Sequence, residues 1–179
     1  RSAVDIWVVL PVMYDEARST VMQALGKGDA VWSYNCLVQD AYSPKWTVDF
    51  APVNFRIQPG ILNQAMSLDG LLYWRVDYWK GNPWTNINNT GTFSSGNYPG
   101  EGVLVYPGTD VGIQGVAPTM RLKWLRDGTD DYEYIELLKA QGRGEWALAT
   151  ARQAGSDWRT WTRSADFLES VRYQLGSEL

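Results

Sequence analysis

The segment Gly70–Trp79, GLLYWRVDYW, gives the strongest indication of the fold. Its first residues are apolar or aromatic and have high β-strand propensity, so they predict a buried strand that ends near Trp74. Charged and aromatic residues follow at once, including Asp77 and Trp79. In α/β proteins, residues just past the carboxyl end of a strand line the ligand crevice. Such a cluster is typical of a sugar-binding wall, and packing in a core or lid is the alternative.

Two more strands are predicted before this segment. Val4–Leu10 (VDIWVVL) is nearly all apolar, as a strand buried on both faces requires, and Asp29–Cys36 (DAVWSYNC) ends in polar residues. Amphipathic helices are expected between the strands, at Asp15–Leu25 and at Val53–Leu68, and the second contains a Pro-Gly pair that should kink it. This alternation predicts an α/β fold with parallel strands and right-handed crossovers.

The second half of the chain is predicted to contain a long loop, a hairpin and helices. Two helices are expected to be separated by a break at Asp127-Gly128, with Asp130 and Glu133 capping the second one. The predicted elements are a loop over 80–102, a hairpin of 103–106 with 111–116, helices beginning at Ala117 and Thr129, and helices over Glu145–Gln153 and Asp157–Tyr173.

Three parallel strands are too few for a closed barrel, which needs about eight. A sheet that begins with Val4–Leu10 would therefore expose an apolar edge. We expect this edge to be covered by upstream sequence, by a second copy of the chain in a homo-oligomer, or by the C-terminal helices.

Composition excludes several classes of function. The chain has 179 residues, no histidine, one cysteine (Cys36) and a net charge of −4. A Ser-His-Asp or Cys-His catalytic site cannot be built, and we expect no metal and no other cofactor. The acidic balance argues against nucleic acid as a partner, and no apolar run approaches the ~20 residues of a membrane span. Proton chemistry would fall to carboxylates, tyrosines or lysines.

Four segments together resemble the C-terminal part of the catalytic domain of glycoside hydrolase family 123, also described as domain of unknown function 4091. The similarity runs from about Val4 to Leu138. Its most specific part is YPG at 106–108, followed by Arg121 and by RDG at 126–128. The segments are VDIWVVL, GDAVWSYNC, DGLLYWRVDYW, and GEGVLVYPG with RLKWLRDGTDDYEYIELL.

The resemblance implies a partial (β/α)₈ barrel over residues 1–140, holding the last three strands, with C-terminal helices over 141–179 packed on it. It implies hydrolysis of β-linked N-acetylgalactosaminides, in which the substrate's acetamido oxygen attacks the anomeric carbon. The catalytic Asp-Glu pair of the family lies upstream, so no catalytic residue is assigned here and the chain alone is expected to be inactive. Asp15-Glu16 is expected at a helix N-terminus instead.

Residues of the sugar-binding wall follow from the same resemblance. Tyr34, Trp74, Asp77 and Trp79 are the predicted substrate-binding residues, with packing or a surface position as their alternative. Arg56 and Arg121 are expected in buried ion pairs with Asp49 or Asp127. Glu101 stands where the family more often has Asp, and its role stays open.

The expected partner is therefore an amino-sugar glycan. The alternative functions are a non-catalytic carbohydrate-binding domain and an oligomeric structural domain. The family suggests a secreted or periplasmic protein.

Overall fold

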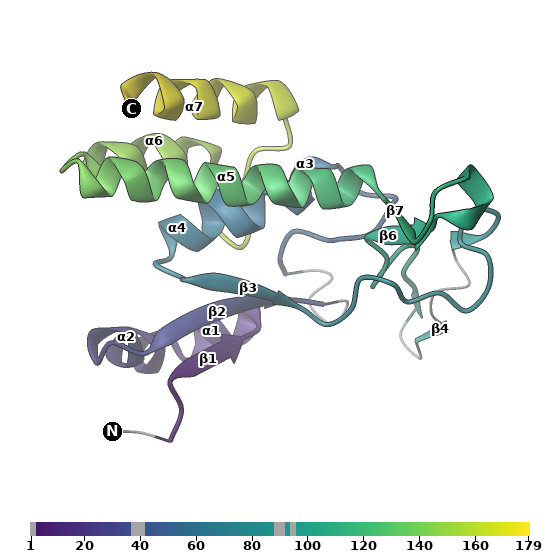
Figure 1. The fold of residues 1–179 in the computed structure, drawn as a ribbon. Helices are drawn as coiled ribbons and strands as arrows, with labels where there is room; N and C mark the ends of the chain where they lie inside the picture. Colours follow the sequence, from purple (N-terminus) through teal and green to yellow (C-terminus); the bar gives the residue numbers. More distant parts are fainter. Residues whose placement is uncertain (1–2, 37–41, 88–91, 94–95) are drawn as a thin grey trace.

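The alternation of strands and helices predicted for the first half of the chain is present in the computed structural model (Figure 1). The structure describes residues 3–36, 42–87, 92–93 and 96–179. In this part of the chain, no helix is both long and apolar enough to span a membrane. The elements are β1 (Ile6–Val9), α1 (Pro11–Glu16), α2 (Arg18–Gly26), β2 (Ala30–Asn35), α3 (Val53–Ile57), the π-helix η2 (Gln58–Leu62), α4 (Asn63–Ala65), β3 (Gly70–Tyr73), β4 (Thr92–Phe93), β5 (Gly96–Asn97), β6 (Val105–Pro107), the 3₁₀-helix η4 (Thr109–Val111), β7 (Val116–Pro118), α5 (Met120–Ala140), α6 (Gly144–Ala154), β8 (Gly155–Asp157), β9 (Thr160–Trp161) and α7 (Ala165–Glu178).

The first three strands form a parallel sheet in the order β1-β2-β3, as predicted. One face of this sheet is covered by helices, because Val31 packs in the main core with residues of α1 and α2. Ser33 and Asn35 point to the same face and are also buried. Ser33 Oγ donates to Asn63 Oδ1 (2.8 Å), and Asn35 Nδ2 donates to Gln58 Oε1 (2.6 Å). The polar residues of β2 therefore bind this strand to η2 and the start of α4.

The opposite face of the sheet is largely bare of other elements in the described part of the chain. Ile6, Val8 and Leu72 are 49%, 43% and 36% exposed. The Trp32 ring lies over Gly70, where a Cβ would come within 2.8 Å of it. Helices α6 and α7 pack on α5, beyond α3 and α4 as seen from the sheet (Figure 1), so the C-terminal helices do not cover β1. That third candidate for covering the edge is wrong.

The first helix begins earlier than predicted. Pro11 occupies the first turn of α1, where a missing N–H and a fixed φ are tolerated, and a second helix starts at Arg18. Asp15 and Glu16 consequently lie in the last turn of α1, so the prediction of a helix N-terminus there is wrong. Asp15 instead accepts a hydrogen bond from the Tyr42 hydroxyl.

The Pro59-Gly60 pair does alter its helix, as predicted. Around Pro59, which has no N–H to donate, the chain widens from α3 into the π-helix η2 and then continues as α4. Facing it, α5 runs unbroken through Asp127-Gly128, so the predicted break is wrong. A Cβ at Gly128 would lie 2.4 Å from the Arg56 carbonyl oxygen, and a Cβ at Gly60 would lie 2.6 Å from the Gly128 carbonyl oxygen. These glycines permit a close contact between helices.

Three boundaries in the second half also differ from the predictions. The return strand β7 pairs with β6 further along than expected, so Pro118 is in a strand and not in a helix. Helix α5 starts after Thr119, whose hydroxyl accepts from the Leu122 N–H (3.2 Å). The hairpin β8–β9 precedes the last helix, which begins after Ser164 and not at Asp157.

Arg56 is buried, as predicted, but its ion-pair partners differ. Its guanidinium contacts Asp131 in bidentate fashion, at 2.6 Å from Nε and 3.0 Å from Nη2, and also contacts Glu169. Burial alone would lower the pKa of Arg56, but the hydrogen bonds and charges of Asp131 and Glu169 more than offset this, so its pKa is raised. Asp127 pairs with the exposed Arg126 instead. The ion pairs of Arg56 join α3 to α5 and α7.

Replacement of Gly128 by alanine tests the close contact between helices. We expect Gly128→Ala to lower the free energy of unfolding by about 2–3 kcal/mol, because the new methyl meets backbone and cannot be accommodated by a rotamer change. Gly26→Ala is the matched control, since no atom lies within 4 Å of the position that a Cβ would take there, and it should change stability by less than about 1 kcal/mol. Urea unfolding measures both. Equal losses in the two variants would contradict the contact.

Candidate functional site

The candidate site lies at the carboxyl ends of β2 and β3. These ends point toward the lobe that carries β4, β6 and β7 (Figure 1). The segment 98–103 returns to this edge, where Gly102 O accepts from the Tyr78 N–H (2.9 Å). It carries Glu101, which is only 1% exposed. A buried carboxylate must be hydrogen-bonded to be tolerated, so its partners define the site.

Side chains that follow β3 hold Glu101. The Trp74 indole Nε1 donates to Glu101 Oε1 at 3.0 Å. The Tyr73 hydroxyl is hydrogen-bonded to Glu101 and accepts from the Gly102 N–H (2.7 Å). Burial, followed by the charge of Glu101, raises the pKa of Tyr73 well above its ordinary value. Tyr73 therefore stays protonated and acts as a donor to the carboxylate.

The glycines on either side of Glu101 give its loop a conformation that other residues would not adopt. Gly100 and Gly102 have φ angles of 79° and 73°. A Cβ at Gly102 would lie 2.7 Å from the Trp74 ring. The tight approach of the loop to the ring therefore depends on glycine, and it fixes the orientation of Trp74.

Tyr34, at the end of β2, lies on the uncovered face of the sheet and is half-buried. Burial, then the charges of Cys36 and Glu101, raise the pKa of its hydroxyl. Tyr34 is thus within electrostatic reach of the same carboxylate that binds Trp74. Trp74 keeps part of its surface exposed and packs on the Tyr78 ring, with the centroids 4.9 Å apart. The structure brings these two predicted residues together around Glu101.

The other two predicted residues lie further along the same segment. Asp77 is exposed and pairs with Arg75 at 2.8 Å, and this hydrogen bond lowers the pKa of Asp77. Trp79 is half-buried, and its Nε1 donates to the Val105 carbonyl oxygen at 2.9 Å. Each has a structural contact of its own: Asp77 with the neighbouring arginine, and Trp79 with β6.

Sequence reasoning does not identify the centre of this cluster. It assigns no role to Glu101 and expects Tyr73 only as a strand residue. The available signal is a glutamate between two glycines, which is unusual unless the backbone needs positive φ on both sides.

Arg121 is expected in an ion pair, but its Nη2 donates to the Val103 carbonyl oxygen (2.6 Å). Over the described residues, no group of three or more Cys, Asp or Glu side chains could hold a metal ion.

Substitution of Glu101 should show that it holds the cluster. Glu101→Leu would leave the Trp74 indole and the Tyr73 hydroxyl without this acceptor, so we expect a loss of about 2–4 kcal/mol in the free energy of unfolding. Glu101→Gln keeps a carbonyl acceptor and should lose less than half as much. Urea unfolding followed by tryptophan fluorescence measures both, and equal losses in the two variants would refute the acceptor role.

The raised pKa of Tyr73 predicts a pH dependence of stability. Above pH 10 the unfolded chain loses the Tyr73 proton while the folded chain keeps it, so the free energy of unfolding should fall as pH rises. This tyrosine contributes up to about 1.4 kcal/mol per pH unit in that range. Tyr73→Phe should make the decline above pH 10 shallower, as measured by denaturant unfolding. An unchanged slope would contradict the prediction.

Comparison with known proteins assigns the chain to a family. Residues 4–138 match the model of the family described as glycoside hydrolase 123, catalytic domain. A search of the curated proteins found no match. Among the solved structures, a family 123 glycoside hydrolase from Clostridium perfringens, studied for glycolipid glycan hydrolysis, is similar over 97% of this chain, with a TM-score of 0.69 and 17% sequence identity. This chain spans 32% of the length of that enzyme. Because the family match covers most of its residues, the chain belongs to glycoside hydrolase family 123 through its catalytic domain.

Proposed function

We propose that this chain is the sugar-facing C-terminal part of a (β/α)₈ glycosidase barrel that cleaves β-linked N-acetylgalactosaminides. The observation that carries the proposal is the orientation of Trp74, fixed by Glu101 and partly exposed at the carboxyl end of a parallel strand. Parallel-sheet enzymes bind their ligands at this end. Family membership supports a glycoside as the substrate class.

The uncovered face of the sheet supports the barrel. In a closed barrel, one face of every strand points into the interior and the other is covered by helices. Here Ile6, Val8 and Leu72 are exposed on one face, while helices pack on the other, where Val31 is buried and only Trp7 of β1 stays 40% exposed. Upstream strands of the same barrel would cover the exposed face and the free edge of β1. A homo-oligomer would be an alternative cover.

In the proposed reaction, the acetamido oxygen of the sugar attacks the anomeric carbon, and an Asp-Glu pair outside this chain orients the acetamido group and protonates the leaving oxygen. The Tyr34 hydroxyl is protonated at neutral pH, and burial raises its pKa further, so it could donate a hydrogen bond to the acetamido group. Trp74 would stack on the sugar ring. Asp77 and Trp79 would complete the wall of the site.

A non-catalytic binding surface is the second candidate. The carboxylate at the centre of the cluster, Glu101, is buried and hydrogen-bonded to Trp74 and Tyr73. It is therefore not placed to protonate a glycosidic oxygen. In this second candidate, the cluster around Glu101 would bind sugar without any catalytic acid or base from another part of the protein.

Sugar binding by this chain tests what the two candidates share, and turnover by the longer protein separates them. We expect this chain to bind N-acetylgalactosamine at millimolar concentration, seen as a change in tryptophan fluorescence, without hydrolysing a chromogenic β-N-acetylgalactosaminide. Trp74→Ala should weaken binding about tenfold, equivalent to about 1.4 kcal/mol of stacking. Trp146→Ala, in the outer helical layer, is the control and should bind normally.

The longer protein that includes the upstream barrel should hydrolyse the substrate. Turnover by this chain alone would refute an upstream catalytic pair. The absence of any fluorescence change at millimolar sugar would refute the binding site itself.

A further inference from the structure

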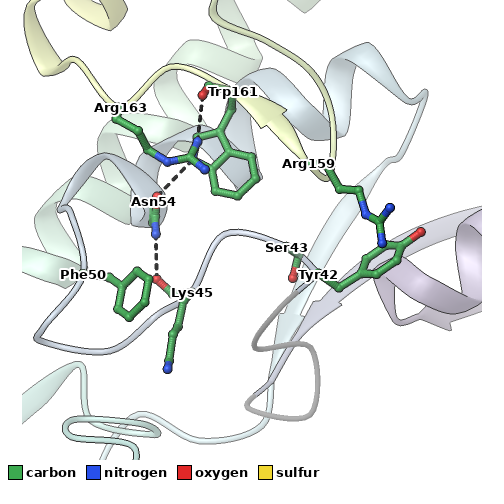
Figure 2. A pocket seen from close by; sticks show the side chains of 8 residues that line it. All are labelled: Tyr42, Ser43, Lys45, Phe50, Asn54, Arg159, Trp161 and Arg163. Carbon is green, nitrogen blue, oxygen red and sulfur yellow. Dashed lines mark hydrogen bonds between the residues drawn. The ribbon is translucent and has the colours of Figure 1, made fainter.

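A hollow lies between the loop residues 42–50 and the hairpin β8–β9 (Figure 2). Its volume is about 360 Å³, which is within the range of small-ligand sites. Its walls come from segments distant from each other in the chain. The lining residues are Tyr42, Ser43, Lys45, Phe50, Asn54, Arg159, Trp161 and Arg163.

The lining of this hollow is strongly basic. It contains Lys45, Arg159 and Arg163 and no carboxylate, and the nearest acidic contact is Asp15, which accepts a hydrogen bond from the Tyr42 hydroxyl. Arg159 and Arg163 form no ion pair with any residue that the structure describes. A concave wall with one sign of charge concentrates ligands of the opposite sign.

Aromatic rings, not carboxylates, hold the two guanidinium groups. Arg159 lies over the Tyr42 ring at 4.3 Å, and Arg163 lies over the Trp161 ring at 3.4 Å (Figure 2). Stacking on a ring leaves the in-plane N–H groups of a guanidinium available to a ligand. Partial burial lowers the pKa of Arg163, as expected for a cation without a paired anion.

Hydrogen bonds fix the rings and the loop in turn. Arg163 Nη1 donates to the Trp161 carbonyl oxygen (2.7 Å), and Trp161 Nε1 donates to Asn54 Oδ1 (3.0 Å). Asn54 Nδ2 donates to the Lys45 carbonyl oxygen at 3.0 Å. Figure 2 shows the Asn54 contacts bridging the hairpin and the loop, so the cationic wall is built before any ligand arrives.

The basic hollow adjoins the segment that carries Glu101. Val48 N–H donates to the Pro99 carbonyl oxygen (2.9 Å), and the Lys45 ammonium lies 5.3 Å from the Tyr98 ring centre. Shortly beyond Pro99, Glu101 binds the Trp74 indole. The segment that contains the lining residue Lys45 is therefore in contact with the segment that carries Glu101.

We propose that this hollow binds an oxyanion, a sulfate group carried by an acidic glycan. Guanidinium groups bind such planar or tetrahedral anions through paired charge-assisted hydrogen bonds. Tyr42, Phe50 and Trp161 supply ring surface for the sugar that bears the anion. The anion site stands independently of the proposed glycosidase function, whereas the glycan as its source rests on that function.

The anion site is tested by side-chain NMR on the intact chain. Sodium sulfate, added against sodium chloride at matched ionic strength, should shift the Nε–H signals of Arg159 and Arg163 and the indole signal of Trp161 with a saturating curve. Arg159→Gln/Arg163→Gln should weaken sulfate binding at least about tenfold. Arg126→Gln, an exposed arginine outside the hollow, is the control. Equal shifts in sulfate and chloride, or unchanged affinity in the double variant, would overturn the site.

The source of the anion is tested with two sugars. Sulfated N-acetylgalactosamine should bind at least about fivefold more tightly than the unsulfated sugar, and the double variant should remove this difference while leaving the unsulfated sugar unaffected. Binding of inorganic sulfate without any preference for the sulfated sugar would overturn the glycan assignment. Loss of unsulfated binding in Trp74→Ala reports separately on the site of the proposed function.

Discussion

The close contact between η2 and α5 is the constraint on which the rest of the structure depends. Two glycines, Gly60 and Gly128, allow the backbones to approach so closely that a methyl group would clash at either position. The bidentate pair of Arg56 with Asp131 crosses the same junction. A buried charge is tolerated only when it is paired, so Arg56 and Asp131 need the two helices to stay close together. The distance between η2 and α5 is thereby fixed. Hydrogen bonds of Ser33 and Asn35 then hold strand β2 against η2 and the start of α4.

Charge and aromatic rings are combined at two neighbouring places beside this scaffold. At the strand ends, a buried carboxylate orients Trp74 and holds the Tyr73 hydroxyl. In the basic hollow, rings instead support the guanidinium groups of Arg159 and Arg163. The first arrangement leaves part of a ring exposed, and the second presents positive charge. Under the proposals above, the two would bind a glycan that has an apolar sugar face and a negative group.

The parallel strands could be predicted from the sequence because their signals are local: apolar runs, strand propensity and the helices between them. The features that could not be predicted depend on residues distant in sequence. In the sequence, Gly128 indicates a helix break, and only the structure shows that a glycine is needed there because the Arg56 carbonyl lies against it. In the sequence, Glu101 indicates only a loop residue, and its hydrogen bonds with Trp74 and Tyr73 are visible only in the structure. The position of Tyr34 and Trp74 at one edge of the sheet could be predicted because parallel strand ends meet there, whereas the basic hollow joins loops that no periodicity connects.

The unequal cover of the two faces of the sheet makes the fold's resistance to local opening uneven. Helices α5, α6 and α7 share one core, with Ile135, Leu138 and Leu168 fully buried. Strand β1 has one edge and much of one face open to water in the described part of the chain. Amide protons of β1 are thus protected from hydrogen exchange only while this strand stays paired to β2. Amide protons of the helical layer are protected while the whole domain stays folded. In this chain by itself, β1 is therefore expected to open locally without unfolding of helices α5, α6 and α7.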